Sequence, residues 1–180
     1  YSKAGEVYCM RPGFESEYRQ PILRLKEEYR GQLDILLGIE SEPFVSIERE
    51  KYDYVIGSVH HLVSDGFYHP IDHSLAQQQT CIREAFGGEP IKMFKAYYEV
   101  LAEATLRNRP EIVGHFDVIT KFGLVDEQDP RYRDAALQAL DAVLSTDAVV
   151  EINTGAMARG LRTVPYPSEF ILKRILEKNG

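Results

Sequence analysis

Cysteine and long apolar stretches are scarce in this sequence, and each shortage excludes a class of protein. Its 180 residues include two isolated cysteines, Cys9 and Cys81, which form no CxxC motif, so a thiolate zinc site is not supported. Two scattered cysteines suit a reducing cytosol, which favours a cytoplasmic protein. No apolar stretch approaches the ~18 residues that a membrane-spanning helix requires, so we predict no membrane partner.

Nucleotide-binding and serine-hydrolase motifs are also missing. The sequence contains no GxGxxG, no Walker lysine loop and no GxSxG elbow. A dinucleotide enzyme, a P-loop nucleotidase and a serine hydrolase therefore lack their usual support. Basic residues are in deficit, because 21 lysines and arginines face 28 aspartates and glutamates, for a net charge of −7. An acidic surface repels a phosphate backbone, so we expect no nucleic-acid partner.

The residues that are present suffice for one folded domain, with 44% hydrophobic and 27% charged residues. Four mostly apolar segments predict buried strands, and they alternate with segments whose apolar spacing fits helices. The predicted strands are LDILLGIE (33–40), YDYVIGSVH (52–60), EIVGHFD (111–117) and AVVEINT (148–154), and the predicted helices are 15–30, 90–105, 131–145 and 168–178. Such alternation is typical of an α/β protein with a parallel sheet covered by helices, in a barrel or in an open doubly wound sheet.

Prolines refine the helix boundaries. Pro21 lies inside the first helical pattern, which predicts that the regular helix starts near it. Pro90 suits the first turn of the second helix, and Pro167 is expected to open the last one. Residues 61–89, between the second strand and the second helix, are predicted to form a long polar connection.

A polar residue ends each predicted strand: Glu40, His60, His115 and Asn153. The carboxyl ends of parallel strands face one side of an α/β fold, and sites are built there. Carboxylate and imidazole together suit zinc, manganese or iron. The pattern therefore predicts a metal or catalytic site that includes Glu40, His60 and His115.

Four of the five histidines lie between residues 54 and 74, and only one of them ends a strand. His61 follows His60 directly, so in an extended chain it points the opposite way and is expected to be a loop residue. We expect His69 to face solvent. His73 has the further alternatives of capping the next segment or reaching the site, and we favour a loop residue for it too.

Four other polar residues near the strand ends each have two interpretations. Asp117 would either orient a ligand histidine or cap the next helix. Arg159 and Arg162 follow the fourth strand and form either a solvated basic loop or a phosphate clamp, for which guanidinium geometry is favoured. Lys121 is a weaker candidate for the same phosphate-binding role.

Four short motifs resemble, in their order, the polymerase-and-histidinol-phosphatase (PHP) domains, and they look most like the histidinol-phosphatase branch. The motifs are LLGIE, YDYVIGSVHHL, EIVGHFDVITKF and VVEINTGAMARG, followed by PSEFILKRILEKNG, so the resemblance covers nearly the whole chain. The resemblance implies a distorted TIM-like β/α barrel, counted as seven-stranded, that holds two or three divalent metal ions at the carboxyl ends of its strands.

By the same resemblance, Glu40 is a carboxylate that bridges metals, and His60 and His115 are metal ligands. Asn153 and Arg159 match positions near the substrate phosphate. Arg162 belongs to the same predicted group of substrate-binding residues.

The chain departs from the family pattern at both ends. The family has an HxH strand and a further histidine before the position of Tyr1, and an aspartate–histidine pair after that of Gly180. We therefore expect residues 1–180 to be a single PHP-type metallophosphoesterase domain, incomplete at both ends, with about four of the seven strands.

The activity that the resemblance implies is hydrolysis of L-histidinol phosphate, a small phosphorylated substrate, in histidine biosynthesis. One alternative is another phosphoesterase or nuclease of the family, with an open basic groove in place of a closed pocket. A second alternative is a non-catalytic domain that retains part of the metal site.

Overall fold

A four-stranded parallel sheet organises the chain in the computed structural model, which describes residues 10–11 and 13–179. The strands lie in the order β1-β2-β5-β6 and all pair in parallel. They are β1 (Gly38–Ser41), β2 (Tyr54–Gly57), β5 (Ile112–Val113) and β6 (Val149–Val150). Each predicted strand segment overlaps one of them, which confirms the parallel α/β architecture.

The strands are shorter than the apolar segments that predict them. Close packing between β1 and β2 explains why residue 38 is a glycine. The ring of Tyr54 in β2 lies where a side chain on Gly38 of β1 would be, since a Cβ there would come within 2.2 Å of the ring. Only glycine fits this position without displacing the ring. Residues 33–37, predicted to belong to the first strand, precede β1 and are not paired in the sheet.

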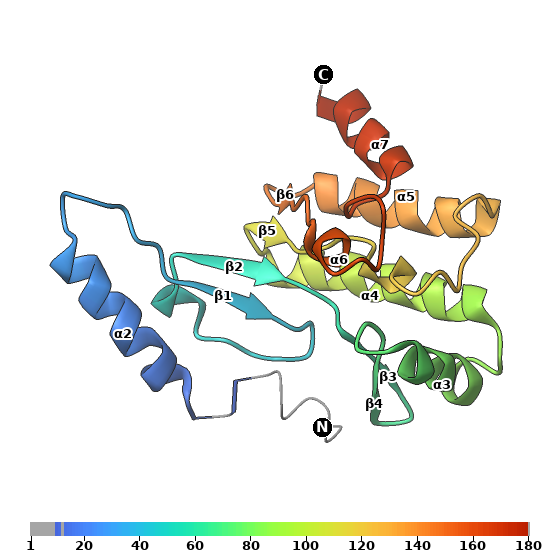
Figure 1. The fold of residues 1–180 in the computed structure, drawn as a ribbon, viewed down its shortest axis with the longest axis horizontal. Helices are drawn as coiled ribbons and strands as arrows, with labels where there is room; N and C mark the ends of the chain where they lie inside the picture. The colour runs from blue at the N-terminus through green and yellow to red at the C-terminus, as the bar shows by residue number, and fades with distance from the viewer. Residues whose placement is uncertain (1–9, 12, 180) are drawn as a thin grey trace.

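Two long helices pack against each other, and the first of them also contacts β2 (Figure 1). They are α4 (Pro90–Asn108) and α5 (Pro130–Leu144), each with proline in its first turn, and both confirm the predicted helices. The last helix, α7 (Glu169–Asn179), begins two residues after Pro167. The shorter helical segments are η1 (Arg49–Lys51) between β1 and β2, η2 (Val118–Thr120) after β5, and α6 (Gly155–Ala158) after β6.

Polar groups inside the core hold the segments that follow the strands. The buried Tyr97 hydroxyl of α4 donates to the carbonyl of Phe116 at 3.0 Å. The fully buried Gln78 donates through Nε2 to the carbonyls of Ile71 and Ile119, at 2.9 and 2.8 Å. Because buried carbonyls need donors, these contacts hold the backbone of the segment after β4, at Ile71, and of the segment after β5, at Phe116 and Ile119.

The prediction of a long polar connection between the second strand and α4 is wrong, because residues 61–89 include a hairpin and a helix. The hairpin pairs β3 (His61–Ser64) with β4 (Phe67–Pro70). Asp65 and Gly66 form its two-residue turn with φ angles of 50° and 79°, the conformation for which Asp-Gly is preferred. The helix is α3 (Leu75–Ala85), whose N-cap Ser74 accepts a hydrogen bond from the Gln77 amide.

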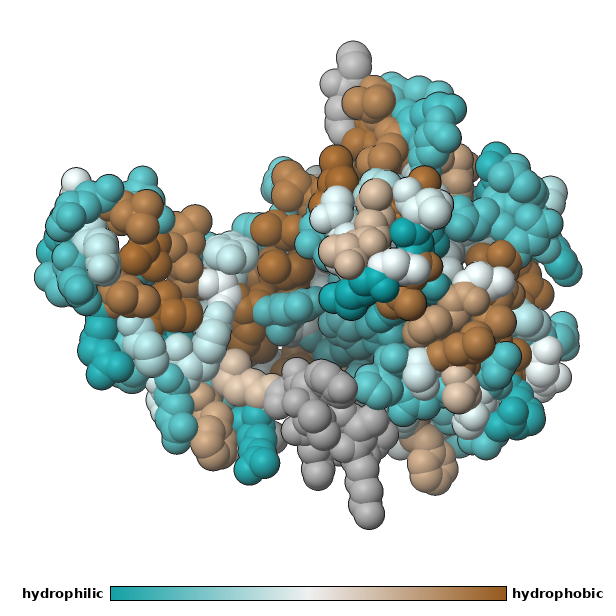
Figure 2. Space-filling model, in the orientation of Figure 1, coloured by the Kyte–Doolittle hydropathy of each residue, from teal (hydrophilic) through white to brown (hydrophobic). Residues whose placement is uncertain are grey.

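The first described helix, α2 (Glu15–Glu28), begins six residues before Pro21, so the start predicted near that proline is wrong. None of its residues is buried, and Tyr18 and Leu25 on the expected apolar face are exposed. Figures 1 and 2 show α2 beside the sheet, with apolar side chains gathered on its lobe. Its anchor to the sheet includes the Tyr18 hydroxyl, which donates to the Gly38 carbonyl at 2.7 Å. Among the described residues, no helix is both long and apolar enough to cross a membrane.

Candidate metal centre

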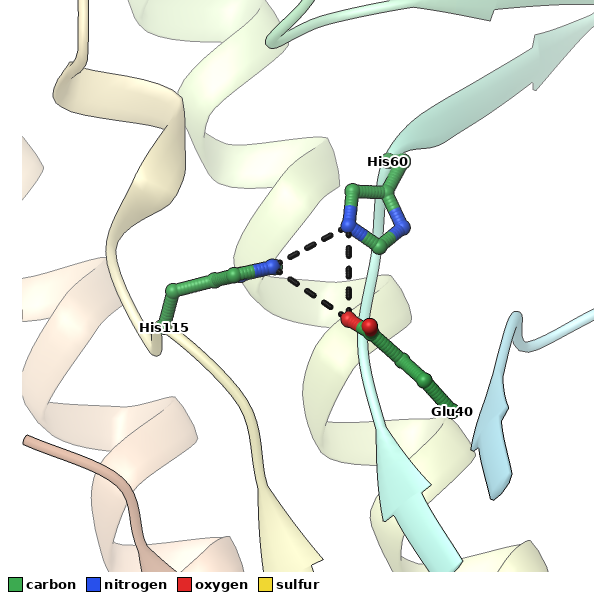
Figure 3. Close-up of side chains that lie close together, drawn as sticks. All are labelled: Glu40, His60 and His115. Carbon is green, nitrogen blue, oxygen red and sulfur yellow. Dashed lines mark hydrogen bonds and ion pairs between the residues drawn. The ribbon is translucent and has the colours of Figure 1, made fainter. Parts of the chain in front are cut away.

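Glu40, His60 and His115 lie together at the carboxyl ends of three adjacent strands (Figure 3). The Nε2 atoms of the two histidines are 3.0 Å apart. Glu40 Oε1 lies 3.5 Å from each of these nitrogens. Three ligand atoms from three segments of the sequence therefore converge on one point.

The sheet order explains this convergence. Glu40 is the third residue of β1, His60 follows β2 by three residues, and His115 follows β5 by two. Since β2 pairs with both β1 and β5 in parallel, all three ends open on the same side. A parallel register turns three distant positions into neighbours.

The three groups fit a metal ion in both chemistry and spacing. Two imidazole nitrogens and one carboxylate oxygen are a donor set for zinc, manganese or iron. A tetrahedral ion with bonds of about 2.0–2.1 Å holds neighbouring ligand atoms roughly 3.3–3.4 Å apart. The three observed separations bracket this value. Among the described residues, this is the one group of three or more histidine, cysteine or acidic side chains with such proximity.

The charges of the site stabilise one another. The His115 ring beside Glu40, with further help from His60, lowers the pKa of that carboxyl to about 2 against the opposing effect of burial. Burial alone would lower the pKa of His60. The hydrogen bond and charge of Glu42, with the charges of Asp72 and Glu40, outweigh it and raise the pKa to about 9.

Glu42 is a site residue that the sequence analysis missed. Its Oε1 lies 2.7 Å from His60 Nδ1, and both of its oxygens accept from the His60 amide at 3.1 and 3.3 Å. His61 Nδ1 lies 3.3 Å from the same Oε1. The spacing of two residues from Glu40 was the available signal, because such residues share a face of an extended chain.

A cavity of about 230 Å³ opens over the three converging groups. Asn153, Arg159 and Lys121, predicted near the substrate phosphate, all line it. The Asn153 side chain is engaged at both ends, since it donates to Glu151 Oε1 at 3.0 Å and accepts from the Gly155 amide at 2.9 Å.

The two cationic groups at the cavity differ in their freedom. Arg159 is exposed. Its guanidinium lies beside Gly155, with Nη2 3.1 Å from the place that a Cβ on that glycine would take. Lys121 is largely buried and donates to the carbonyl of Asp72 at 2.6 Å. Both residues line the same cavity as the two histidines.

Arg162 is placed elsewhere, because its guanidinium is bound to other parts of the chain. It donates to Thr120 Oγ1 at 2.6 Å, pairs with Glu127 at 3.4 Å and lies 4.8 Å from the centre of the Tyr166 ring. Its side chain is 9% exposed, and it does not line the cavity. The loop's two arginines thus do not form one clamp.

Asp117 has a partner that neither interpretation anticipated. Its Oδ2 accepts from the amide and the hydroxyl of Ser168, at 2.9 and 2.5 Å, and it makes no side-chain cap to η2. Burial raises its pKa against the effect of these bonds. The carboxylate that lies beside a converging histidine on the side away from the cluster is Glu42, next to His60 Nδ1.

The remaining histidines lie outside the converging group. His61 and His69 are half-buried residues of β3 and β4, so both are strand residues and not the expected loop residues. His73 is exposed in the loop before α3.

Comparison with known proteins connects this arrangement to a family. A family model for the PHP domain matches residues 6–155. A protein of Schizosaccharomyces pombe named "Probable histidinol-phosphatase" is 32% identical over 178 residues, which cover 91% of this chain and 56% of the relative. A protein of Deinococcus radiodurans with the same name is 31% identical over 170 residues, which cover 90% of this chain and 60% of the relative. The chain therefore spans less than two thirds of the length of these relatives.

The fold is similar to that of a solved structure. A crystal structure from Listeria monocytogenes, assigned as a histidinol phosphatase, superposes with a TM-score of 0.75 over 98% of this chain and 72% of that chain. The identity is 19%, so the likeness is one of fold. It confirms the predicted distorted TIM-like α/β architecture.

Proposed function

The chain belongs to the PHP domain family, and we propose that it carries part of the catalytic site of a metal-dependent phosphomonoesterase that hydrolyses L-histidinol phosphate. The observation that carries the proposal is one cavity that combines a ligand set, Glu40, His60 and His115, with the cations Lys121 and Arg159. The names of the two relatives supply the substrate. We place the reaction in cytoplasmic histidine biosynthesis.

The three converging residues would hold a divalent ion of zinc, manganese or iron. When bound, such an ion lowers the pKa of a coordinated water and supplies hydroxide near neutral pH. Glu40 would bring a negative charge, and both of its carboxylate oxygens are able to act as ligands. We propose two or three ions in all, and ligands for the others would come from outside the group formed here.

The chain's own cations would bind the phosphoryl group. Arg159 lines the cavity and can donate two N–H groups to two phosphoryl oxygens, and Lys121 adds a point charge. Fixed positive charge of this kind stabilises negative charge that develops on those oxygens. Asn153 positions the loop between β6 and α6 through its bonds to Glu151 and Gly155.

The cavity supports a small substrate more than a polymer. Its volume is about 230 Å³, and Glu40, Asp72 and Glu151 line it together with the two cations. A nuclease groove would be expected to carry predominantly positive charge along an extended track. Mixed charge in a small space suits a phosphate ester that also carries cationic groups.

The test is phosphate release by the protein that carries this chain, after chelation and after addition of zinc, manganese or iron. Histidinol phosphate is compared with a panel of nucleoside monophosphates and sugar phosphates. We expect activity that requires metal and a preference for histidinol phosphate. Glu40→Gln should abolish it, whereas Glu50→Gln, the same change at an exposed residue of η1, should leave it unchanged. Metal-independent hydrolysis, or a preference for nucleotides, would contradict the proposal.

A further inference from the structure

Glu42 contacts the edge of the His60 ring opposite the edge that faces the other ligands. Its Oε1 lies 2.7 Å from Nδ1, while Nε2 of the same ring lies 3.0 Å from His115 and 3.5 Å from Glu40. Figure 3 shows one ring nitrogen of His60 directed at the cluster and the other directed away. We propose that Glu42 is a positioning residue, which fixes His60 with hydrogen on Nδ1 and its Nε2 lone pair toward the metal. The inference rests on the proposed function, since it takes Glu40, His60 and His115 as ligands.

The chemistry of the two groups dictates the hydrogen position. An ionised carboxylate only accepts hydrogen bonds, so the ring nitrogen beside it must carry the hydrogen. In a neutral imidazole the other nitrogen then has a free lone pair, as a metal ligand requires. A carboxylate at this place also raises the basicity of the coordinating nitrogen.

Glu42 is itself held in place by several donors. The His60 amide donates to both of its oxygens, and His61 Nδ1 lies 3.3 Å from Oε1. Its side chain is 18% exposed, so water competes little for these bonds. The His61 ring packs edge-on against Tyr68 of β4, with centroids 6.4 Å apart, so the hairpin supports the second donor. The carboxylate is thereby tied to the backbone as well as to the ring.

His115 has no equivalent support, which makes the effect of Glu42 specific to one ligand. Its Nδ1 is buried and has no hydrogen-bond partner among the described residues. Its backbone amide instead donates to Glu151 Oε2 at 2.7 Å. Removing Glu42 should therefore alter His60 and leave the ring environment of His115 largely as it was.

The experiment measures zinc affinity and the His60 ring, without substrate. Zinc is titrated against a chromophoric chelator with the protein that carries this chain, and the Nδ1–H signals of the histidines are followed by NMR in the zinc-loaded protein. We expect Glu42→Ala to weaken zinc binding about 10- to 100-fold, the range for loss of such outer carboxylates. The protected Nδ1–H signal of His60 should be lost, and the signals of His115 should be retained. The zinc affinity of Glu42→Gln, which keeps an acceptor without the charge, should lie between that of the wild type and that of Glu42→Ala.

Glu50→Gln is the matched control, because it removes one exposed carboxylate from η1 and should leave zinc affinity within about twofold of wild type. If Glu42→Ala does not fold, Glu42→Gln decides, and a loss of fivefold or more supports the proposal. Zinc affinity in the Glu42 variants equal to that of the control, or an unchanged His60 Nδ1–H signal in Glu42→Ala, would overturn it. Because no turnover is measured, a protein inactive on histidinol phosphate would disprove the proposed function without deciding the role of Glu42.

Discussion

Arg159 and Arg162 lie three residues apart after β6, yet their alanine variants should fail in different ways. Arg159 is exposed at the cavity that contains the three ligands. Arg162 is 9% exposed and bound to Thr120, Glu127 and Tyr166. We therefore expect Arg159→Ala to damage catalysis and Arg162→Ala to damage stability.

The loss of kcat/KM expected for Arg159→Ala follows from the hydrogen bond that the arginine can make to the substrate. A hydrogen bond to a charged group contributes roughly 1.5–3 kcal/mol. If that bond is made to the phosphoryl group, its loss lowers kcat/KM by about 10- to 150-fold. Metal content should not change, because arginine is not a ligand. The free energy of unfolding should change by less than about 0.5 kcal/mol, as for an exposed residue.

The magnitude for Arg162 follows from the contacts that it makes within the chain. Its position over the Tyr166 ring contributes about 0.5–2 kcal/mol, and its bond to Thr120 about 1 kcal/mol. Arg162→Ala should therefore lower the free energy of unfolding by about 1.5–3 kcal/mol and lower Tm by about 3–12 °C for a chain of this size. Its effect on kcat/KM should be much smaller than that of Arg159→Ala, although Tyr166 also lines the cavity.

The assay compares steady-state kinetics on histidinol phosphate, metal analysis and thermal unfolding for the two variants and the wild type. The assignment of Arg159 to the substrate phosphate is refuted if Arg159→Ala leaves the kinetics unaltered, or if that variant loses metal together with activity. It also fails if Arg162→Ala retains full stability but loses as much kcat/KM as Arg159→Ala, because the phosphate clamp would then be assigned to the wrong arginine.

Three further predictions concern the ligands and the core. Glu40→Ala and His60→Ala should abolish phosphatase activity and reduce bound metal, whereas His69→Ala should leave both nearly intact; equal losses in all three would refute the ranking. Because the pKa of His60 is raised to about 9, its ring carries a proton at pH 7 that an incoming metal must displace. Zinc affinity should therefore increase with pH up to about 9, by at most tenfold per unit for this proton, and calorimetry in buffers of different ionisation enthalpy should detect its release at pH 7. Gln78→Ala should lower the free energy of unfolding, measured with urea, by about 2–4 kcal/mol, because two buried carbonyls lose their donors. A decrease below about 1 kcal/mol would show that these two bonds contribute little to stability.

The sequence by itself determined the architecture and the edge of the sheet where the site lies. Apolar strand segments alternating with helical spacing specified a parallel sheet, because each segment's periodicity records which of its faces is covered. Glu40, His60 and His115 each followed such a segment, and parallel strands bring their carboxyl ends to one side. These inferences needed only local pattern and one geometric rule.

Only the tertiary structure decided which polar groups contact one another. Arg162 pairs with Thr120, 42 residues away, and Asp117 with Ser168, 51 residues away, so neither role was visible in the local sequence. Periodicity could place Glu42 on the same face as Glu40, but not beside His60, which it reaches because the chain after β1 passes beside the chain after β2. A pattern of apolar residues fixes the orientation of an element, whereas the partner of a buried charge depends on side chains that only the packed fold brings within hydrogen-bond distance.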